Sequence, residues 1–367
     1  MKPGLYIHIP FCRQKCNYCD FASFAGLENL IPAYLAALRL DAAKAPAKQV
    51  ETLYVGGGTP SLLSAAQLAQ LCALLQKEFG PISALPESTC EANPESLTPE
   101  KLTVLKNFGF TRLSLGLQSL DDKELKLLGR VHTRADFLRA YQAARAAGFD
   151  NINIDLIAGL PGQTLEQFLA NLQGVIALKP EHLSVYGLQI EEGTPFFERG
   201  IVCDQLLMRR MLEETHRQLI QAGFEHYEIS NFALPGRQAR HNTSYWRDGE
   251  YIGLGSEAAS YWKGERRQNV SSVQEYIRRM QAGESPVCYA EHLTGKEKLG
   301  EQVMLGLRLL DGVELTDEIR QAFGRDIQTH IKNGLLTQEN NKIKLTFEGL
   351  FLANEVFCSF VAPFEEE

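Results

Sequence analysis

The stretch "PFCRQKCNYCDF", residues 10–21, decides how the rest of the chain is interpreted. It places three cysteines, Cys12, Cys16 and Cys19, on one short segment. A disulfide would leave one thiol unpaired, and a structural zinc site would normally show a second pair of ligands. Three thiolates suit a cubane iron–sulfur cluster, because three protein ligands leave one iron open to a small molecule. Zinc remains the alternative, since Cys16 and Cys19 alone fit either metal.

Composition limits the class of protein. The chain has 367 residues, 44% of them hydrophobic, which suffices for a large core and about two domains. Its net charge of −8 and the lack of a basic block argue against a nucleic-acid partner. No segment approaches the length of a membrane span, and the first residues lack the apolar stretch of a signal peptide. We therefore expect a soluble cytoplasmic protein, in whose reducing surroundings clustered thiols indicate a metal.

The first half of the chain alternates short β-rich runs with helical patterns. Strands are expected within 5–9, 52–60, 88–94, 112–119, 151–162 and 182–189. Helices are expected near 32–44, 65–80, 99–108, 121–129, 134–147 and 164–178. This order predicts parallel strands joined by crossover helices. Because a closed barrel needs eight strands, the fold class is α/β, an open, partial (β/α)6 barrel with its ligand at the carboxyl ends of the strands.

The pattern changes after about residue 203. A strong helix is expected over 205–223, followed by a loop-rich stretch, and helices and a hairpin around Asn340–Asn341 close the chain. The sequence therefore predicts a barrel over 1–203, a helical and loop extension over 204–289, and a small winged-helix-like module over 290–367. The hairpin is not basic enough for DNA binding, so we expect the module to serve in docking.

A second motif, "GGGTP" at residues 56–60, follows an expected strand. Three glycines let a ligand approach bare backbone, although a tight turn is the alternative. Together with it, "CRQKCNYC" resembles the CxxxCxΦC signature of radical S-adenosylmethionine enzymes, where Φ is aromatic. The resemblance implies a [4Fe–4S] cluster on Cys12, Cys16 and Cys19, with S-adenosylmethionine on the open iron and its amino group at the glycines. A valine at Gly57 or Gly58 is then expected to block this cofactor and leave the cluster intact.

The resemblance narrows with "YIHIPFC", "VGGGTPS", "LGLQS", "LLGRVHT", "NIDLIAGLPGQT" and "HLSVYGLQ". These segments together resemble the oxygen-independent coproporphyrinogen III oxidase family, over essentially the whole chain. The resemblance implies a cofactor site made of Tyr6, Tyr18, Gly57, Gly58, Thr59, Glu91, Gln118, Arg130 and Asp155. Independently of the family, Asp155 lies in an apolar strand, where a buried carboxylate is costly without a partner. Ordinary strand-end polarity is the alternative for Glu91, Gln118 and Asp155.

The sequence also departs from the oxidases. Family members that decarboxylate the porphyrinogen carry a further cysteine where this chain has Phe21, and they have an N-terminal extension before the cysteine loop. Both departures resemble the HemW branch, which is regarded as a group of haem chaperones. Its HNxxYW motif matches "HNTSYW", residues 241–246. In "GLGSEAASY", however, Glu257 stands where that branch has a glycine.

The motif implies that His241 is an axial ligand of haem, because imidazole is a common protein ligand of haem iron. We expect it to be exposed in a loop, and the alternative is a structural histidine among core aromatics. The predicted function is a haem chaperone with a cluster and S-adenosylmethionine. It would deliver haem to an acceptor protein, with peripheral membrane contact through that acceptor.

Two other functions compete with this prediction. One is an active oxygen-independent coproporphyrinogen III oxidase, and the other is a zinc-stabilised binding module. Phe21 argues against coproporphyrinogen III dehydrogenase activity, whereas the sequence leaves open whether the protein is an enzyme of another kind. Cys72 and Cys358 are expected to be inert core cysteines.

Overall fold

Six parallel strands form the centre of the molecule. The computed structural model describes residues 2–363. The six strands pair in chain order, each parallel to the next: β1 (Gly4–Ile9), β2 (Thr52–Gly57), β3 (Glu87–Ala92), β4 (Arg112–Gln118), β5 (Ile152–Ala158) and β6 (His182–Gly187). The helices between them are α1 (Ile31–Lys44), α2 (Ala65–Phe79), α3 (Pro99–Phe108), α4 (Asp122–Leu127), α5 (Arg134–Ala146) and α6 (Leu165–Ala177). The predicted partial barrel is confirmed.

Local sequence determines where several crossover helices begin. Helix α2 starts with a capping box, in which the Ser64 side chain and the Gln67 side chain each accept the other residue's backbone N–H. Helix α6 starts in the same way with Thr164 and Gln167. Such boxes pair backbone donors that the first helical turn leaves free. The strands they follow are almost fully buried, as parallel strands between two layers require.

The sheet extends beyond the six strands at both edges. Strand β9 (Tyr251–Leu254) pairs parallel to β1, and β10 (Ala259–Trp262), β11 (Glu265–Asn269) and β12 (Val287–His292) continue it antiparallel. At the other edge, β8 (Asn231–Ala233) pairs with β6, and β7 (Glu225–Glu228) pairs with β8. The sheet thus has 12 strands and stays open. The predicted helical and loop extension over 204–289 also contains the five short strands β7 to β11 and the start of β12.

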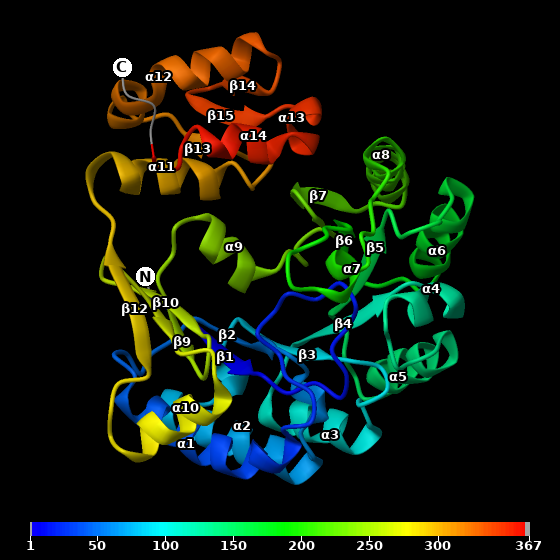
Figure 1. Ribbon diagram of the computed structural model, residues 1–367, viewed down its shortest axis with the longest axis vertical. Helices are drawn as coiled ribbons and strands as arrows, with labels where there is room; N and C mark the ends of the chain where they lie inside the picture. The colour runs from blue at the N-terminus through cyan, green and yellow to red at the C-terminus, as the bar shows by residue number, and fades with distance from the viewer. Residues whose placement is uncertain (1, 364–367) are drawn as a thin grey trace.

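The helices between β6 and β12 are α7 (Pro195–Glu198), α8 (Gln205–Gln221), α9 (Arg240–Trp246) and α10 (Val273–Gln281). Short 3-10 turns lie at Glu28–Leu30, Pro60–Leu62 and Ile82–Ala84. Figure 1 shows α1 to α6 outside the curved sheet, with α9 on its inner side. No helix within the described residues is long and apolar enough to cross a membrane.

The C-terminal part forms a separate core. Helices α11 (Gly295–Gly306), α12 (Asp317–Lys332), α13 (Phe347–Phe351) and α14 (Ala353–Cys358) surround a small sheet of β13 (Val313–Glu314), β15 (Lys342–Leu345) and β14 (Leu336–Glu339). The expected hairpin turns at Asn340–Asn341, both in the left-handed region. The three-part division stays a prediction, and its boundary at 290 falls inside β12. Cys358 is exposed, so its expected place in the core is wrong, whereas Cys72 is buried.

A buried carboxylate joins the late strands and α10 to the first helix of the barrel. The Oδ2 atom of Asp41 on α1 accepts hydrogen bonds from the Tyr276 hydroxyl at 2.7 Å and from the Gly255 N–H at 3.1 Å. Beside it, the Tyr34 hydroxyl donates to the His8 carbonyl and accepts from the Ser256 N–H. These buried bonds hold the β9–β10 turn against β1, whose last residues lead into the cysteine loop.

We predict that Tyr276→Phe lowers the free energy of unfolding by about 1–3 kcal/mol, because it leaves the buried Asp41 with one donor fewer. The matched control is Tyr289→Phe, since the Tyr289 hydroxyl donates to Glu291 on an exposed strand. That change should leave the free energy nearly unaltered. Urea unfolding followed by circular dichroism measures both, and equal losses would contradict the assignment.

Candidate functional site

One cavity of about 1170 Å³ lies at the carboxyl ends of the parallel strands and reaches towards α8, β7 and the C-terminal module. The structure brings most of the predicted site residues to its lining: Cys12, Cys16, Cys19, Tyr18, Gly57, Gly58, Thr59, Glu91, Gln118, Arg130 and Asp155. Tyr6 and His241 do not line it. The location agrees with the rule that parallel α/β sheets bind ligands beyond the carboxyl ends of their strands.

The cysteine loop leaves β1 and runs along one side of the cavity. Its three thiols are free, and two of them already meet polar partners. The Cys12 sulfur lies 3.4 Å from the Thr59 hydroxyl, and the Cys16 sulfur accepts from Arg130 Nη1 at 3.5 Å. Burial raises the pKa of the Cys12 and Cys19 thiols, so a thiolate at either position needs a compensating cation. The donor set therefore fits a metal cluster.

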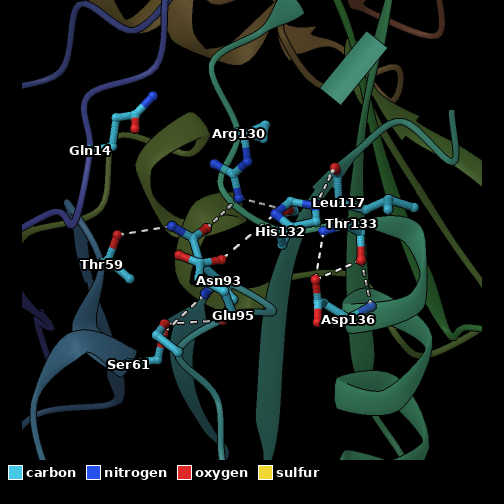
Figure 2. Close-up of polar contacts among 12 residues, drawn as sticks. Gln14, Thr59, Ser61, Asn93, Glu95, Leu117, Arg130, His132, Thr133 and Asp136 are labelled. Carbon is cyan, nitrogen blue, oxygen red and sulfur yellow. Dashed lines mark hydrogen bonds and ion pairs between the residues drawn. The ribbon is translucent and has the colours of Figure 1, made fainter. Parts of the chain in front are cut away.

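A polar network links this loop to the ends of the next strands. Asn93 donates from Nδ2 to the Thr59 hydroxyl at 3.0 Å and accepts from Arg130 Nη2 at 2.7 Å. Arg130 also donates to the Gly116 carbonyl at 2.8 Å. Figure 2 shows Asn93 between Thr59 and Arg130. The sequence did not single out Asn93, although its place two residues after Glu91 at a strand end was the available signal.

Two carboxylates face the cavity without an ion-pair partner in the described residues. Glu91 accepts from the Tyr54 hydroxyl at 2.6 Å and from the Gly57 N–H at 3.1 Å, and burial raises its pKa to about 7. Asp155 accepts from Asn153 Nδ2 at 2.7 Å, and burial raises its pKa as well. The buried Nε of Arg130 has no partner. Two buried carboxyl groups without an ion-pair partner and a guanidinium with one free N–H suit S-adenosylmethionine, which carries an ammonium, a sulfonium and a carboxylate.

The glycines of "GGGTP" are needed for a different reason from the one expected. A Cβ on Gly58 would lie 2.8 Å from the Phe11 carbonyl oxygen and 2.9 Å from that of Ile9. A Cβ on Gly57, whose φ is +109°, would lie 2.6 Å from the His8 ring. Both positions are filled by the strand that carries the cysteine loop. The expectation that a larger side chain there blocks only the cofactor is therefore wrong, because it would first displace the protein's own loop.

Tyr6 lies outside the cavity lining and contacts the cysteine loop through His8. His8 Nε2 lies 2.9 Å from the Ala22 carbonyl, which can only accept, so this nitrogen carries the proton. His8 Nδ1 therefore accepts from the Tyr6 hydroxyl at 2.9 Å. Tyr6 fixes the tautomer of a histidine that ties the far end of the cysteine loop to β1. Its predicted contact with the cofactor stays a prediction.

His241 is buried on α9, and the expectation that it is an exposed loop residue is wrong. Its Nδ1 lies 2.7 Å from the Thr52 hydroxyl and its Nε2 2.6 Å from the Tyr245 hydroxyl. Its ring stacks on Tyr54, and burial lowers its pKa to about 3. Both ring nitrogens are thus occupied in this conformation. Haem ligation by His241 stays a prediction, and it would require one of these bonds to break.

Other residues singled out from the sequence lie as follows. Tyr18 and Phe21 both line the cavity, and the Phe21 side chain is 66% exposed. Gln118 closes β4 with a φ of +71°. Glu257 has a φ of +61°, in the left-handed region where a glycine is more usual, and it accepts from Gln268 outside the cavity. The substitution at 257 therefore affects a turn of the sheet edge rather than the lining of the cavity.

Comparisons with known proteins agree with this geometry. Residues 6–173 match the Radical SAM superfamily, and residues 293–352 match the HemN C-terminal domain. The haem chaperone HemW of Bacillus subtilis is 36% identical over 97% of this chain and 98% of its own length. HemW of Escherichia coli is 41% identical over 70% of this chain and 69% of its own length.

A solved structure matches almost the entire fold. Coproporphyrinogen III oxidase (HemN) of Escherichia coli, described as a radical SAM enzyme, superimposes with a TM-score of 0.86 at 26% identity. The match covers 98% of this chain and 90% of the oxidase. The open sheet and the C-terminal module are therefore shared between a chaperone family and an oxidase, so the fold alone does not separate the two functions.

We predict that replacing Cys12, Cys16 or Cys19 with alanine abolishes the brown iron–sulfur absorption after anaerobic reconstitution, because these are the cysteines that line the cavity within the described residues. Cys288→Ala is the control, since Cys288 is exposed and lies outside the cavity lining. Stoichiometric zinc without sulfide in the unaltered protein would overturn the prediction.

We predict that Gly58→Ala costs about 1–3 kcal/mol of stability and reduces cluster incorporation, because the new methyl group overlaps the Phe11 and Ile9 carbonyls. The matched control is Gly324→Ala on α12, where no atom lies within 4 Å of the added carbon. Iron and sulfide analysis beside thermal unfolding measures both effects. A Gly58→Ala protein with a full cluster and loss of S-adenosylmethionine binding alone would contradict the packing argument.

Proposed function

The chain belongs to the HemW family of haem chaperones in the Radical SAM superfamily, and from this membership we propose that it binds haem and delivers it to an acceptor protein. As a radical SAM protein it has a [4Fe–4S] cluster and S-adenosylmethionine as cofactors, for which the three thiols, the two buried carboxyl groups and the guanidinium provide a fitting site. When bound, these cofactors supply one-electron redox chemistry.

The observation that carries the proposal is the size and the uneven lining of the cavity. Its volume of about 1170 Å³ exceeds the range of about 300–1,000 Å³ that is usual for one small ligand. Near the cysteine loop it is lined by thiols, glycines and carboxylates, and near α8, β7 and the C-terminal module by histidines, phenylalanines and arginines. A cavity of this kind has room for the cofactors at one end and an apolar, metal-containing ligand at the other.

The residues of the cofactor end have separable tasks. Arg130 and Asn93 hold the cysteine loop against β2 and leave the Arg130 Nε free for an acidic group. Glu91 orients the Gly57 N–H and keeps a carboxylate available to a cationic group. These groups are placed to position a ligand beside the cysteine loop.

The oxidase is the less supported alternative. Phe21 presents a phenyl ring to the cavity, and a phenyl ring can neither ligate iron nor exchange a proton. We further propose that the protein is cytoplasmic and that it contacts the membrane peripherally through its haem acceptor, whose identity is unknown.

The test is made on one anaerobically purified sample of the full chain. Haem titration should give about one haem per chain with a shifted Soret band, as expected for an axially ligated iron. Incubation with coproporphyrinogen III, S-adenosylmethionine and a reductant should yield no vinyl-bearing product. Turnover in the absence of haem binding would reject the chaperone function and favour the oxidase.

A further inference from the structure

Two histidines form a pair at the end of the cavity remote from the cysteine loop. His216 lies on α8 and His226 on β7, and both line the cavity. Their Nδ1 atoms lie 3.0 Å apart. Neither belongs to the cluster site or to the "HNTSYW" segment, so the functions assigned above leave both unused.

The hydrogen bonds of the pair fix which nitrogens carry protons. His226 Nε2 lies 3.2 Å from the Ile229 carbonyl, which can only accept, so Nε2 is protonated. Burial lowers the pKa of His226 to about 4, so its Nδ1 is an unprotonated acceptor near pH 7. His216 must then donate from Nδ1. Its Nε2 is left with a free lone pair and has no hydrogen-bond partner among the described residues.

This is the arrangement in which a histidine binds a metal. Metal-ligating imidazoles usually donate their other N–H to a neighbouring acceptor, which fixes the ring and raises the basicity of the ligating nitrogen. His226 provides that acceptor and is itself held, stacked on Phe232 with centroids 4.0 Å apart. No group of three or more potential metal ligands lies near the pair in the described residues, so a bare ion would lack ligands. An iron that is already held by a macrocycle needs only one protein ligand, which His216 can provide.

The surroundings match a flat, apolar ligand with acidic edges. The ring centroid of Phe347 on α13 lies 5.1 Å from that of His216, and Phe347 is 46% exposed. The ring centroid of Phe351 lies 5.2 Å from that of Phe347.

Arg308 lines the same cavity. Its guanidinium lies 4.3 Å from the Trp246 ring and pairs with Glu228 at 4.0 Å, while its Nε has no hydrogen-bond partner among the described residues. Haem presents a ring face for phenylalanines and propionates for an arginine.

We propose that His216 Nε2 is the axial ligand of haem, held at the end of the cavity between α8 and α13, with His226 as its positioning residue. This inference rests on the proposed function and replaces His241 as the ligand. Haem then lies at the opposite end of the cavity from the three cysteines. This end of the cavity is lined by residues of α8 and of the C-terminal module, which Figure 1 shows above the sheet.

The experiment is a ferric-haem titration of the reconstituted full chain followed by absorption spectroscopy. His216→Ala should weaken binding by about ten-fold or more, and added imidazole should restore the original spectrum. His216→Met should bind haem with a changed ligand-field spectrum, because methionine is an alternative axial ligand. His226→Phe keeps the stacking and removes the acceptor, so it should weaken binding less than His216→Ala does.

His241→Ala and His292→Ala are the comparison variants, the second because His292 is exposed on β12. Both should retain the affinity and the spectrum of the unaltered protein, and cluster content should be the same in all variants. Loss of haem in His241→Ala with unchanged His216→Ala would overturn the assignment and place haem at α9. An unaltered chain that binds no haem would refute the proposed function, and the inference with it.

Discussion

The backbone contact between Gly58 and the start of the cysteine loop is the constraint on which the site depends. The Gly58 N–H donates to the Ile9 carbonyl at 2.9 Å, and the space a Cβ would need is filled by Ile9, Pro10 and Phe11. The contact continues the parallel register of β1 and β2, in which Ile9 is opposite Gly57. The Cys12 N–H then donates to the Phe24 carbonyl, closing the loop upon itself. Because Gly58 has no side chain, the chain after β2 can lie directly against the end of β1, and the cysteine loop that follows β1 is placed beside the cavity.

The sequence predicted the six central strands because each is a short β-rich run flanked by turn and helix signals, even where, as in β3, most of its residues are polar. It missed β7 to β12 for physical reasons. Every residue of β10 is only half-buried, β8 spans three residues, and β9 contains Gly253, so none shows a clear alternation. Strand β9 also pairs with β1, which lies more than 200 residues before it in the sequence. Such a pairing is determined by tertiary packing, which local propensity does not reveal.

The histidines illustrate the same limit at the level of the site. "HNTSYW" is conspicuous in sequence, yet its histidine is buried and hydrogen-bonded to Thr52 on β2. The Glu87 carboxylate on β3 accepts from the backbone N–H of the same histidine at the start of the helix. Neither partner is near it in the chain. His216 instead lies within an ordinary amphipathic helix, and His226 follows after a turn at Gly223. Their contact exists only because β7 folds back on α8, so no spacing rule would have paired them.

The two ends of the cavity are held together by forces of different kinds. At the cysteine end, buried hydrogen bonds among Thr59, Asn93 and Arg130 fix the lining, and leaving any of these groups unpaired would be costly. At the other end, backbone hydrogen bonds from Ile229 to Arg308 and from Leu310 to Tyr227 join β7 to the C-terminal module, whereas α8 meets α13 through the exposed ion pair of Arg209 with Glu348 and aromatic contacts to the half-exposed Phe347. Water competes well for such side-chain contacts, so they oppose separation only weakly. The proposed haem end is thus joined to the barrel by backbone pairing at β7, and the side-chain contacts between α8 and α13 are the part of its wall that water can replace.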